Sequence, residues 1–418
     1  LCPHLPQESL LRHELIRPTL AEVHPVTKAY LNTFRRIVDL PTAPFAERHV
    51  VAYIRDFVVR RPALRMGTDA FGNLLVKYLP PRRPKGALRG RPILFAAHLD
   101  HPGFLAEAMI DATHVRAEWR GWVQARYFRN ERIKFFVDGR WIPAVIEEVD
   151  PYPPNQSPRR ATTSARSFGA DSPPMAVTAK VATAVPPGSI GMWNIPDAVI
   201  RGHRIHARVC DDTAGVAAII CALDAFCRRG LPCSCYACFT RAEEVGFAGA
   251  LGAVDARTLP QDALVVAVEC SRAIPGVALG DGPVLRVGDK ASVFTPAVTA
   301  YCQVAAEQLA VKDRSFRFQR KLMDGGTCES TAYCHYGYDA TGICLPLVNY
   351  HNMDGQRGRI APESVDVRDF LNLVKWFIAL AASPAKMKFD GRHPGLDQRL
   401  DALLKQHRRR LLKTAASR

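Results

Sequence analysis

The stretch RPILFAAHLD, residues 91–100, is an apolar run that ends abruptly in polar side chains. Such a run is typical of a strand that is buried on both faces, as in a parallel sheet with helices on either side. His98 would then stand at the carboxyl end of the strand, where open α/β sheets form their ligand sites. This stretch therefore predicts a central strand with an imidazole at the edge where a site would form.

The chain on both sides of this strand alternates between helical and strand patterns. Residues 27–60 carry apolar side chains at helical spacing, and 69–79 read as a turn followed by a strand. A helix, three strands and a last helix follow in DDTAGVAAIICALDAFCRR (211–229), CSCYACFT (233–240), ALVVAVE (263–269), TGICLPLV (341–348) and DVRDFLNLVKWFIALAA (366–382). We predict an α/β fold with a mixed sheet flanked by helices.

A different pattern interrupts this alternation. Residues 104–200 hold short β-like pieces and no long helical stretch, which predicts a small inserted β domain. Its middle, 151–174, is rich in Pro, Ser and Arg and is expected to be a surface excursion. The α/β domain would then be discontinuous, 1–103 and 201–390, with a basic tail at 391–418. A chain of 418 residues exceeds the usual size of a single core, which agrees with this division.

The composition is that of an ordinary globular protein, with 48% hydrophobic and 23% charged residues. No stretch approaches the apolar length of a membrane span, and the beginning of the sequence lacks a signal pattern. The 12 cysteines are scattered through apolar segments, where cysteine behaves as a small buried hydrophobe. We therefore expect a cytoplasmic protein without a membrane partner.

The net charge of +16 raises the question of a nucleic-acid partner. Much of the excess lies in three segments, 81–91, 157–166 and 405–418, and no aromatic residue is interleaved with the basic ones there. A surface for single strands needs aromatic side chains on which bases stack. The sequence thus argues against specific nucleic-acid binding.

Acidic and imidazole residues recur at the ends of successive predicted strands and at the start of one helix. They are His98, Asp211, Glu243, Glu244, Glu269 and His351. Because the carboxyl ends of neighbouring parallel strands meet at one edge, a single crevice could collect them all. Nitrogen and oxygen ligands of this kind suit zinc, with cobalt or manganese as substitutes, and no cysteine is expected to be a ligand.

The order of these residues resembles the tetrahedral aminopeptidases, which include glutamyl aminopeptidases and belong to the dizinc exopeptidases. The resemblance runs from about residue 30 to 382. Its motifs are AAHLDHPGF (96–104), RVCDDTAGV (208–216), TRAEEVGFAGA (240–250), ALGDGPVL (278–285), DGGTCEST (324–331) and NYHNM (349–353). It implies a zinc exopeptidase-like sheet with a barrel-like insertion, and a homo-oligomer that is either a dimer or a dodecamer.

The resemblance also implies a role for each site residue. Asp211 would bridge two metal ions, His98 and Glu269 would complete one metal site, and Glu244 and His351 the other. Asp100 would orient the His98 ring without being a ligand. Glu243 would be the general base.

This set of residues has a direct chemical rationale. Two cations about 3.5 to 4 Å apart lower the pKa of a shared water and polarise the scissile carbonyl. A carboxylate must then accept the proton and return it to the leaving amine, which is the part expected of Glu243. The predicted activity is hydrolysis of amino-terminal peptide bonds, with a peptide or a small amide as substrate.

The chain departs from the usual pattern of the family at four positions. The family commonly has an acid where this chain has His101, an arginine at Thr213 and an aspartate at Cys328, and its fourth ligand is usually aspartate where Glu269 stands. No departure removes a ligand or the base. We expect these departures to affect substrate preference and the contacts between subunits.

Two other functions remain open from the residues themselves. A deacylase or carboxypeptidase would use the same kinds of ligand, although such enzymes place their bridging aspartate soon after the first histidine, whereas here the whole inserted segment separates His98 from Asp211. The second alternative function is that of a non-catalytic, basic binding protein that keeps the fold. A zinc knot of Cys233, Cys235 and Cys238 is not expected, because successive residues of a strand point to opposite faces, which places the first two cysteines on one face and Cys238 on the other.

Overall fold

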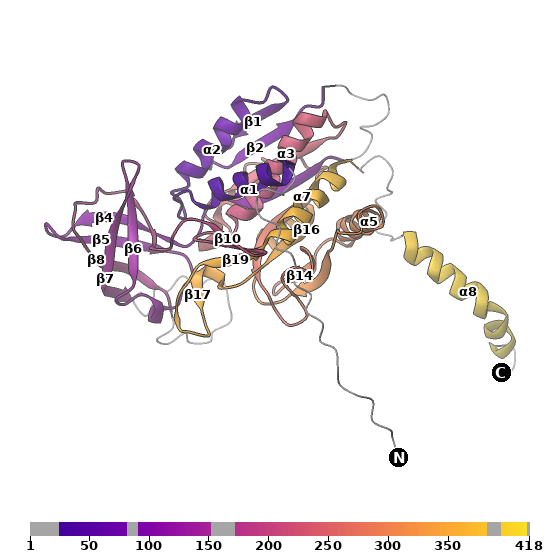
Figure 1. The fold of residues 1–418 in the computed structure, drawn as a ribbon. Helices are drawn as coiled ribbons and strands as arrows, with labels where there is room; N and C mark the ends of the chain where they lie inside the picture. Colours follow the sequence, from indigo (N-terminus) through magenta and orange to yellow (C-terminus); the bar gives the residue numbers. More distant parts are fainter. Residues whose placement is uncertain (1–24, 82–90, 152–171, 383–393, 416–418) are drawn as a thin grey trace, which may run out of the picture.

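The structure, a computed structural model, describes residues 25–81, 91–151, 172–382 and 394–415. Its centre is an eight-stranded mixed sheet (Figure 1). From one edge to the other the strands are β1 (Leu64–Thr68), β2 (Leu74–Tyr78), β12 (Cys235–Thr240), β3 (Ile93–His98), β13 (Leu264–Arg272), β16 (Asp339–Leu347), β14 (Val284–Asp289) and β15 (Gln319–Met323). The predicted mixed sheet is confirmed, and every residue of β3 is buried.

The four middle strands, β12, β3, β13 and β16, run parallel to one another. Their carboxyl ends therefore lie at the same edge of the sheet. One prediction about them was wrong. Glu269 does not end its strand, because β13 stays paired with β16 through Arg272 and Leu347. Glu269 consequently lies inside a strand, where the pairing of β13 with β16 holds its backbone.

Helices cover both faces of the sheet. One face packs against α1 (Pro25–Val38), α2 (Arg48–Val59), α3 (Thr213–Arg229), α5 (Pro296–Lys312) and α7 (Val367–Ala382), and the other against α4 (Ala248–Asp255) and α6 (Glu329–His335). The cysteines of β12 and of the segment just before it follow this division as predicted. Cys233 and Cys235 belong to the cluster on the first face and Cys238 to that on the second.

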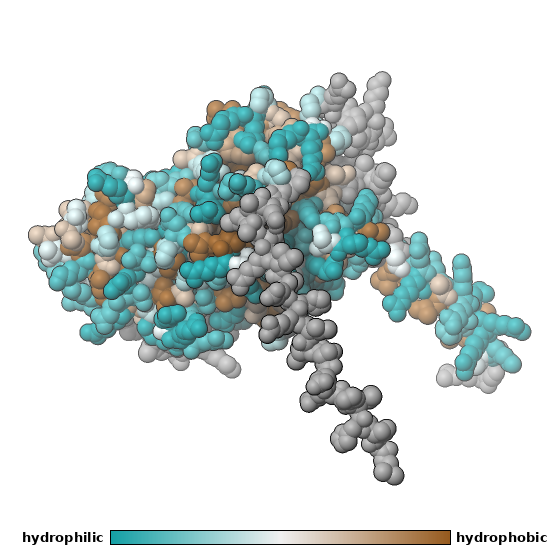
Figure 2. Space-filling view, viewed as in Figure 1, coloured by the Kyte–Doolittle hydropathy of each residue, from teal (hydrophilic) through white to brown (hydrophobic). Residues whose placement is uncertain are grey.

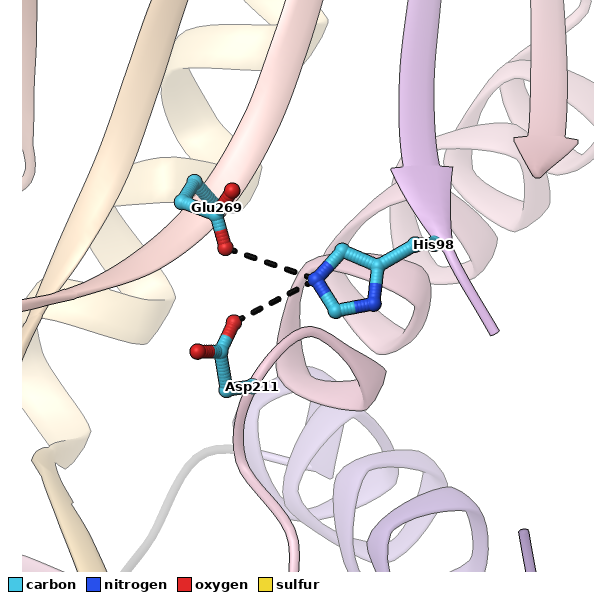
Figure 3. Close-up of side chains that lie close together, drawn as sticks. All are labelled: His98, Asp211 and Glu269. Carbon is cyan, nitrogen blue, oxygen red and sulfur yellow. Dashed lines mark hydrogen bonds and ion pairs between the residues drawn. The ribbon is translucent and has the colours of Figure 1, made fainter. Parts of the chain in front are cut away.

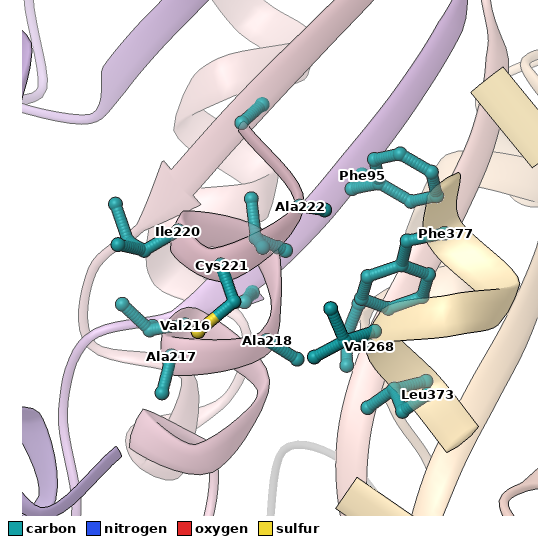
Figure 4. Packing of buried hydrophobic residues seen from close by; sticks show 14 of the residues in the cluster. Phe95, Val216, Ala217, Ala218, Ile220, Cys221, Ala222, Val268, Leu373 and Phe377 are labelled. Carbon is teal, nitrogen blue, oxygen red and sulfur yellow. The ribbon is translucent and has the colours of Figure 1, made fainter. Parts of the chain in front are cut away.

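Helix α3 forms the middle of the larger core. It is rich in small apolar residues and is buried on almost every side, from Thr213 to Phe226. A helix that is apolar all round needs packing partners all round. Figure 4 shows its residues beside Val268 of β13, Phe95 of β3 and Phe377 of α7. The ring centroids of Phe95 and Phe377 are 4.4 Å apart, so strand and helix are packed directly.

A closed six-stranded barrel lies at one side of this α/β unit (Figure 1). Its strands, in order around the barrel, are β4 (Gly103–Met109), β5 (His114–Arg120), β8 (Pro174–Val181), β7 (Arg140–Pro151), β6 (Arg132–Val137) and β9 (Ile190–Trp193). Phe104, Trp119, Phe128 and Trp193 fill its interior through edge-on ring contacts. The predicted barrel-like insertion is present, while its boundaries at 104 and 200 stay predictions.

Two smaller features complete the fold. Strands β10 (Val199–Arg201), β11 (Arg204–Ala207) and β19 (Glu363–Asp366) form a short sheet, and β17 (Met353–Asp354) pairs with β18 (Arg359–Ile360). Of the predicted surface excursion at 151–174, residues 152–171 lie outside the described part of the chain. Among the described helices, none is both long and apolar enough to span a bilayer.

The basic tail contains an element that the sequence reading did not foresee. Residues Pro394–Ala415 form a helix, α8, which stands apart from the rest of the molecule (Figure 1).

We expect Phe95→Ala to destabilise the chain by about 3 to 5 kcal/mol, because it removes an aromatic ring from the packed core. Val59→Ala is the matched control, since Val59 is 83% exposed and surface changes of this kind cost at most about 0.5 kcal/mol. Urea unfolding followed by circular dichroism measures both. A loss at Phe95 no larger than that at Val59 would contradict this packing.

Candidate metal centre

The carboxyl ends of the parallel strands bring the predicted site residues together. His98 is the last residue of β3, and Glu269 lies near the end of β13. Glu243 and Glu244 belong to the short helix η4 (Glu243–Val245), which follows β12. His351 lies in η5 (Tyr350–Asn352), after β16, and Asp211 lies two residues before the start of α3.

Three of these side chains form the first cluster (Figure 3). Nε2 of His98 lies 3.4 Å from Oδ1 of Asp211 and 3.4 Å from Oε1 of Glu269. One ligand atom of each residue lies within 4.8 Å of the other two, and all three residues are buried. These atoms are close enough to share one cation.

A second cluster lies on the other side of the same aspartate. Nε2 of His351 is 3.8 Å from Oδ2 of Asp211 and 3.0 Å from Oε2 of Glu244. Asp211 thus presents Oδ1 to His98 and Oδ2 to His351. Glu243 is part of a third grouping, with His98 and Glu244.

Asp100 ties the His98 strand to the loop that carries the two glutamates. Its carboxylate oxygens accept the backbone N–H groups of Glu243 at 3.0 Å and Glu244 at 3.1 Å. Nδ1 of His98 lies 3.1 Å from the backbone oxygen of Asp100 and 3.6 Å from its carboxylate. Donation from Nδ1 leaves the Nε2 lone pair free to face the cluster.

Glu363 of β19 is a positioning residue that the sequence reading missed. Its Oε2 accepts the N–H groups of Cys210 at 2.6 Å and Asp211 at 3.1 Å, and its Oε1 accepts that of His351 at 2.8 Å. One buried carboxylate therefore fixes the backbone of both Asp211 and His351. No motif surrounds Glu363, so no sequence signal pointed to it.

His101, which stands where the family commonly has an acidic residue, also has a structural role. Nδ1 of His101 faces the backbone oxygen of Asp211 at 2.8 Å, and Nε2 faces Oδ1 of Asn352 at 3.1 Å. The Asn352 amide is oriented by its Nδ2, which donates to the backbone oxygens of Arg208 and Ala361. His101 thus connects the segment of Asp211 to that of His351. His101 and Asn352 both lie inside motifs that carry a ligand, and this placement is the signal that could have found their role.

The inserted barrel contacts the site at Trp122. Nδ1 of His351 donates to the backbone oxygen of Trp122 at 2.7 Å. The Tyr350 ring stacks on the other side of the same imidazole, with centroids 3.7 Å apart. The ring orientation of His351 is therefore set by the barrel and by a neighbouring tyrosine.

The cluster concentrates acidic groups in a buried place. Burial raises the pKa of Asp211 well above its usual range, and the charge of Glu269 adds to the effect. Burial raises the pKa of Glu243 in the same way. Burial alone would lower the pKa of His98, but its contacts with the carboxylates of Asp100, Asp211 and Glu269 raise it. These shifts show that the cluster favours added positive charge.

The residues fit a pair of divalent cations. Asp211 Oδ1, Glu244 Oε1 and His351 Nε2 are buried and have no hydrogen-bond partner among the described residues. Buried polar atoms are normally paired, so their lack of partners needs an explanation. Imidazole and carboxylate atoms in this arrangement are the donor set that zinc prefers.

Cys328 stands where the family commonly has aspartate. Its thiol is not suited to nucleophilic chemistry. The residue is 1% exposed, and burial raises the pKa of its thiol to about 12. A thiol must ionise to act as a nucleophile.

The fold is that of known aminopeptidases. The TET1 peptidase of Pyrococcus horikoshii is 20% identical, with a TM-score of 0.65 over 85% of this chain and 99% of its own. Aminopeptidase APDkam598 of Desulfurococcus kamchatkensis is 21% identical, with a TM-score of 0.64 over 85% and 95%. An M18-family aminopeptidase of Thermotoga maritima is 13% identical, with a TM-score of 0.57 over 87% and 97%.

Sequence comparison makes the assignment more specific. The profile of the M42 glutamyl aminopeptidase family matches residues 82–358, which is more than half of the chain. The chain belongs to this family, as the motifs predicted, and it is a hydrolase that acts on peptide bonds.

We expect Glu363→Gln to weaken metal binding about 10- to 100-fold, as is common when a group that supports metal ligands is lost. Glutamine keeps the shape of the side chain, but its NH2 group cannot accept a backbone N–H. Competition with a fluorescent zinc chelator measures the affinity. Glu148→Gln, at an exposed position of the barrel, is the control, and equal affinity in both variants would contradict the role of Glu363.

Glu329 of α6 provides a pH-dependent prediction. Its Oε2 accepts the Tyr333 hydroxyl at 3.3 Å, and its Oε1 is buried without a partner among the described residues. Burial raises its pKa from 4.5 to about 7. The folded state therefore binds this proton more tightly than the unfolded chain, so stability is lost as the pH rises through this range.

Glu329→Gln should remove this dependence. In chelator-treated protein, we compare the free energy of unfolding of the variant with that of the parent chain. The difference is expected to shift in favour of the variant by about 3 kcal/mol between pH 4.5 and pH 8. Urea unfolding at several pH values measures the difference. A difference between variant and parent that stays constant with pH would show that Glu329 ionises normally.

Proposed function

We propose that this chain is an aminopeptidase that works with two divalent metal ions, held by His98, Asp211, Glu244, Glu269 and His351. His98 and Glu269 complete one site, Glu244 and His351 the other, and Asp211 belongs to both. The observation that carries the proposal is the placement of Asp211. Its two carboxylate oxygens face different histidines, each with a second carboxylate nearby.

Such a pair of cations would supply Lewis acidity and make a nearby water acidic enough to ionise near neutral pH. Zinc fits the donor set best, and cobalt or manganese are the substitutes to test. The family and the two histidine–carboxylate clusters support this assignment.

Glu243 is the proposed general base. It is buried beside His98 and Glu244, and Asp100 holds its backbone N–H. Burial raises the pKa of its carboxyl group, which makes its carboxylate a stronger base than a solvated one. Its carboxylate takes a proton from the attacking water and delivers it to the nitrogen of the leaving amine. Asp100 contributes by positioning this loop and the His98 ring.

The comparisons also support expectations about assembly and setting. Solved relatives are described as a dodecamer and as a peptidase that forms a tetrahedron or an octahedral shell. We propose that this chain self-assembles too, as a dimer or a dodecamer. The 11 cysteines in the described part of the chain are free thiols, which supports a cytoplasmic setting.

A panel of substrates tests the activity. The chelator-treated chain is reloaded separately with zinc, cobalt or manganese and assayed with aminoacyl anilides, the same anilides N-acetylated, and peptides blocked at the carboxyl end. We expect cleavage only where the α-amine is free, and only after metal is restored. Preferential cleavage of the acetylated anilides would favour the deacylase alternative, and cleavage that needs a free terminal carboxylate would favour a carboxypeptidase.

Glu243→Gln should lower kcat about 100- to 10 000-fold, the range typical of a lost general acid–base group. It should still bind two metal ions per chain, because Glu243 is not one of the proposed ligands. Steady-state kinetics together with elemental analysis separates the two properties. Substantial activity in this variant, or loss of its metal, would contradict the role of Glu243 as base, and Glu148→Gln again serves as the control.

A further inference from the structure

Helix α8 exposes a row of leucines to solvent. From Gly395 to Ala415 every side chain is exposed except that of Asp397, which is partly buried. Six large apolar residues are among them: Leu396, Leu400, Leu403, Leu404, Leu411 and Leu412, each between 42% and 58% exposed. In Figure 2 the helix shows apolar surface next to charged surface, away from the body of the molecule.

Five of the six leucines fall on one side of the helix. At about 100° per residue, the positions of Leu396, Leu400, Leu403, Leu404 and Leu411 span an arc of about 100°, which is the width of a stripe that faces an apolar partner. Lys405 and Arg409 occupy the opposite side. The helix is therefore amphipathic over about 24 Å, from Leu396 to Leu411.

Charge along α8 is also uneven. Its two acidic residues, Asp397 and Asp401, lie in the first half, whereas five basic residues fill the second half: Lys405, Arg408, Arg409, Arg410 and Lys413. A partner for this helix must consequently offer both an apolar layer and negative charge.

Three possible partners meet these requirements unequally. A nucleic acid would neutralise the basic residues but would leave the leucines in water. A second α8 helix would cover the leucines but supplies little negative charge, because a parallel pair brings the two basic halves together and an antiparallel pair sets only two aspartates against five basic residues. An anionic lipid surface offers acyl chains for the leucines and headgroups for the arginines, which is how interfacial helices bind.

We propose that α8 binds anionic membranes, lying in the plane of the lipid–water interface with its leucine stripe inserted. No described helix can span a bilayer, so this attachment would be peripheral. The proposal departs from the expectation of no membrane partner, which rested on the lack of an apolar span; an interfacial helix needs no such span. The inference is independent of the metal centre, and it would place a peptidase at a membrane surface.

Vesicle co-sedimentation of the full chain tests the proposal. We expect at least tenfold stronger binding to vesicles of phosphatidylcholine with phosphatidylglycerol than to pure phosphatidylcholine, and weaker binding as salt increases. Leu400→Ser/Leu404→Ser/Leu411→Ser and Arg408→Glu/Arg409→Glu/Arg410→Glu should each lower the affinity at least tenfold. Peptidase activity towards soluble substrates should not change in either variant.

Matched controls come from exposed positions of the folded body. Val59→Ser/Val293→Ser/Val311→Ser removes three exposed apolar side chains outside α8, since these residues are at least 75% exposed. Lys312→Glu/Arg314→Glu/Arg320→Glu makes the same charge change away from α8. Both controls should bind vesicles as the parent chain does.

Three results would overturn the proposal. Equal or absent binding to the two kinds of vesicle would exclude an anionic lipid surface as the partner. If the leucine variant still bound the vesicles, the leucines would not be inserted, and charge attraction alone would explain the binding. A change of oligomeric state in the leucine variant by sedimentation velocity, without an effect on vesicle binding, would show that α8 contacts a second copy of the chain.

Discussion

The arrangement depends on the requirement that buried carboxylates be compensated by positive charge. Asp211, Glu243 and Glu269 are all buried at one edge of the sheet, beside the nearly buried side chain of Glu244. Removing such charges from water is costly unless a cation or a hydrogen-bond donor is at hand. His98 and His351 lie at coordinating distances and present their Nε2 atoms to the carboxylates. Divalent cations between these groups would meet the requirement.

The surrounding fold serves to hold these few atoms in place. The parallel strands deliver His98 and Glu269 at one edge of the sheet, and the small sheet with β19 supplies Glu363, which fixes the backbone of Asp211 and His351. The barrel contributes the Trp122 oxygen that orients the His351 ring. Segments far apart in the sequence thus meet at Asp211, so the site forms only when the whole domain is folded.

Much of this could be predicted from sequence, for a physical reason. A strand buried on both faces is continuously apolar, which marked β3, and polar residues at its end stand out against that background. Most ligand candidates were recognisable because they lie in motifs, and Glu269 because it follows an apolar strand pattern. Glu363 was not, because a buried glutamate in a short strand has no local pattern and its role depends on partners more than 100 residues away. The end of β13 was misjudged for a related reason, since pairing with β16 carries the strand beyond Glu269.

The central claim is that Asp211 is shared by two metal ions. Anomalous X-ray diffraction at the zinc absorption edge, from crystals of the zinc-loaded chain, tests it most directly. The account predicts two peaks about 3.5 to 4 Å apart, one beside His98 and Glu269 and the other beside Glu244 and His351, both within coordinating distance of Asp211. A single peak, or peaks away from Asp211, would contradict it.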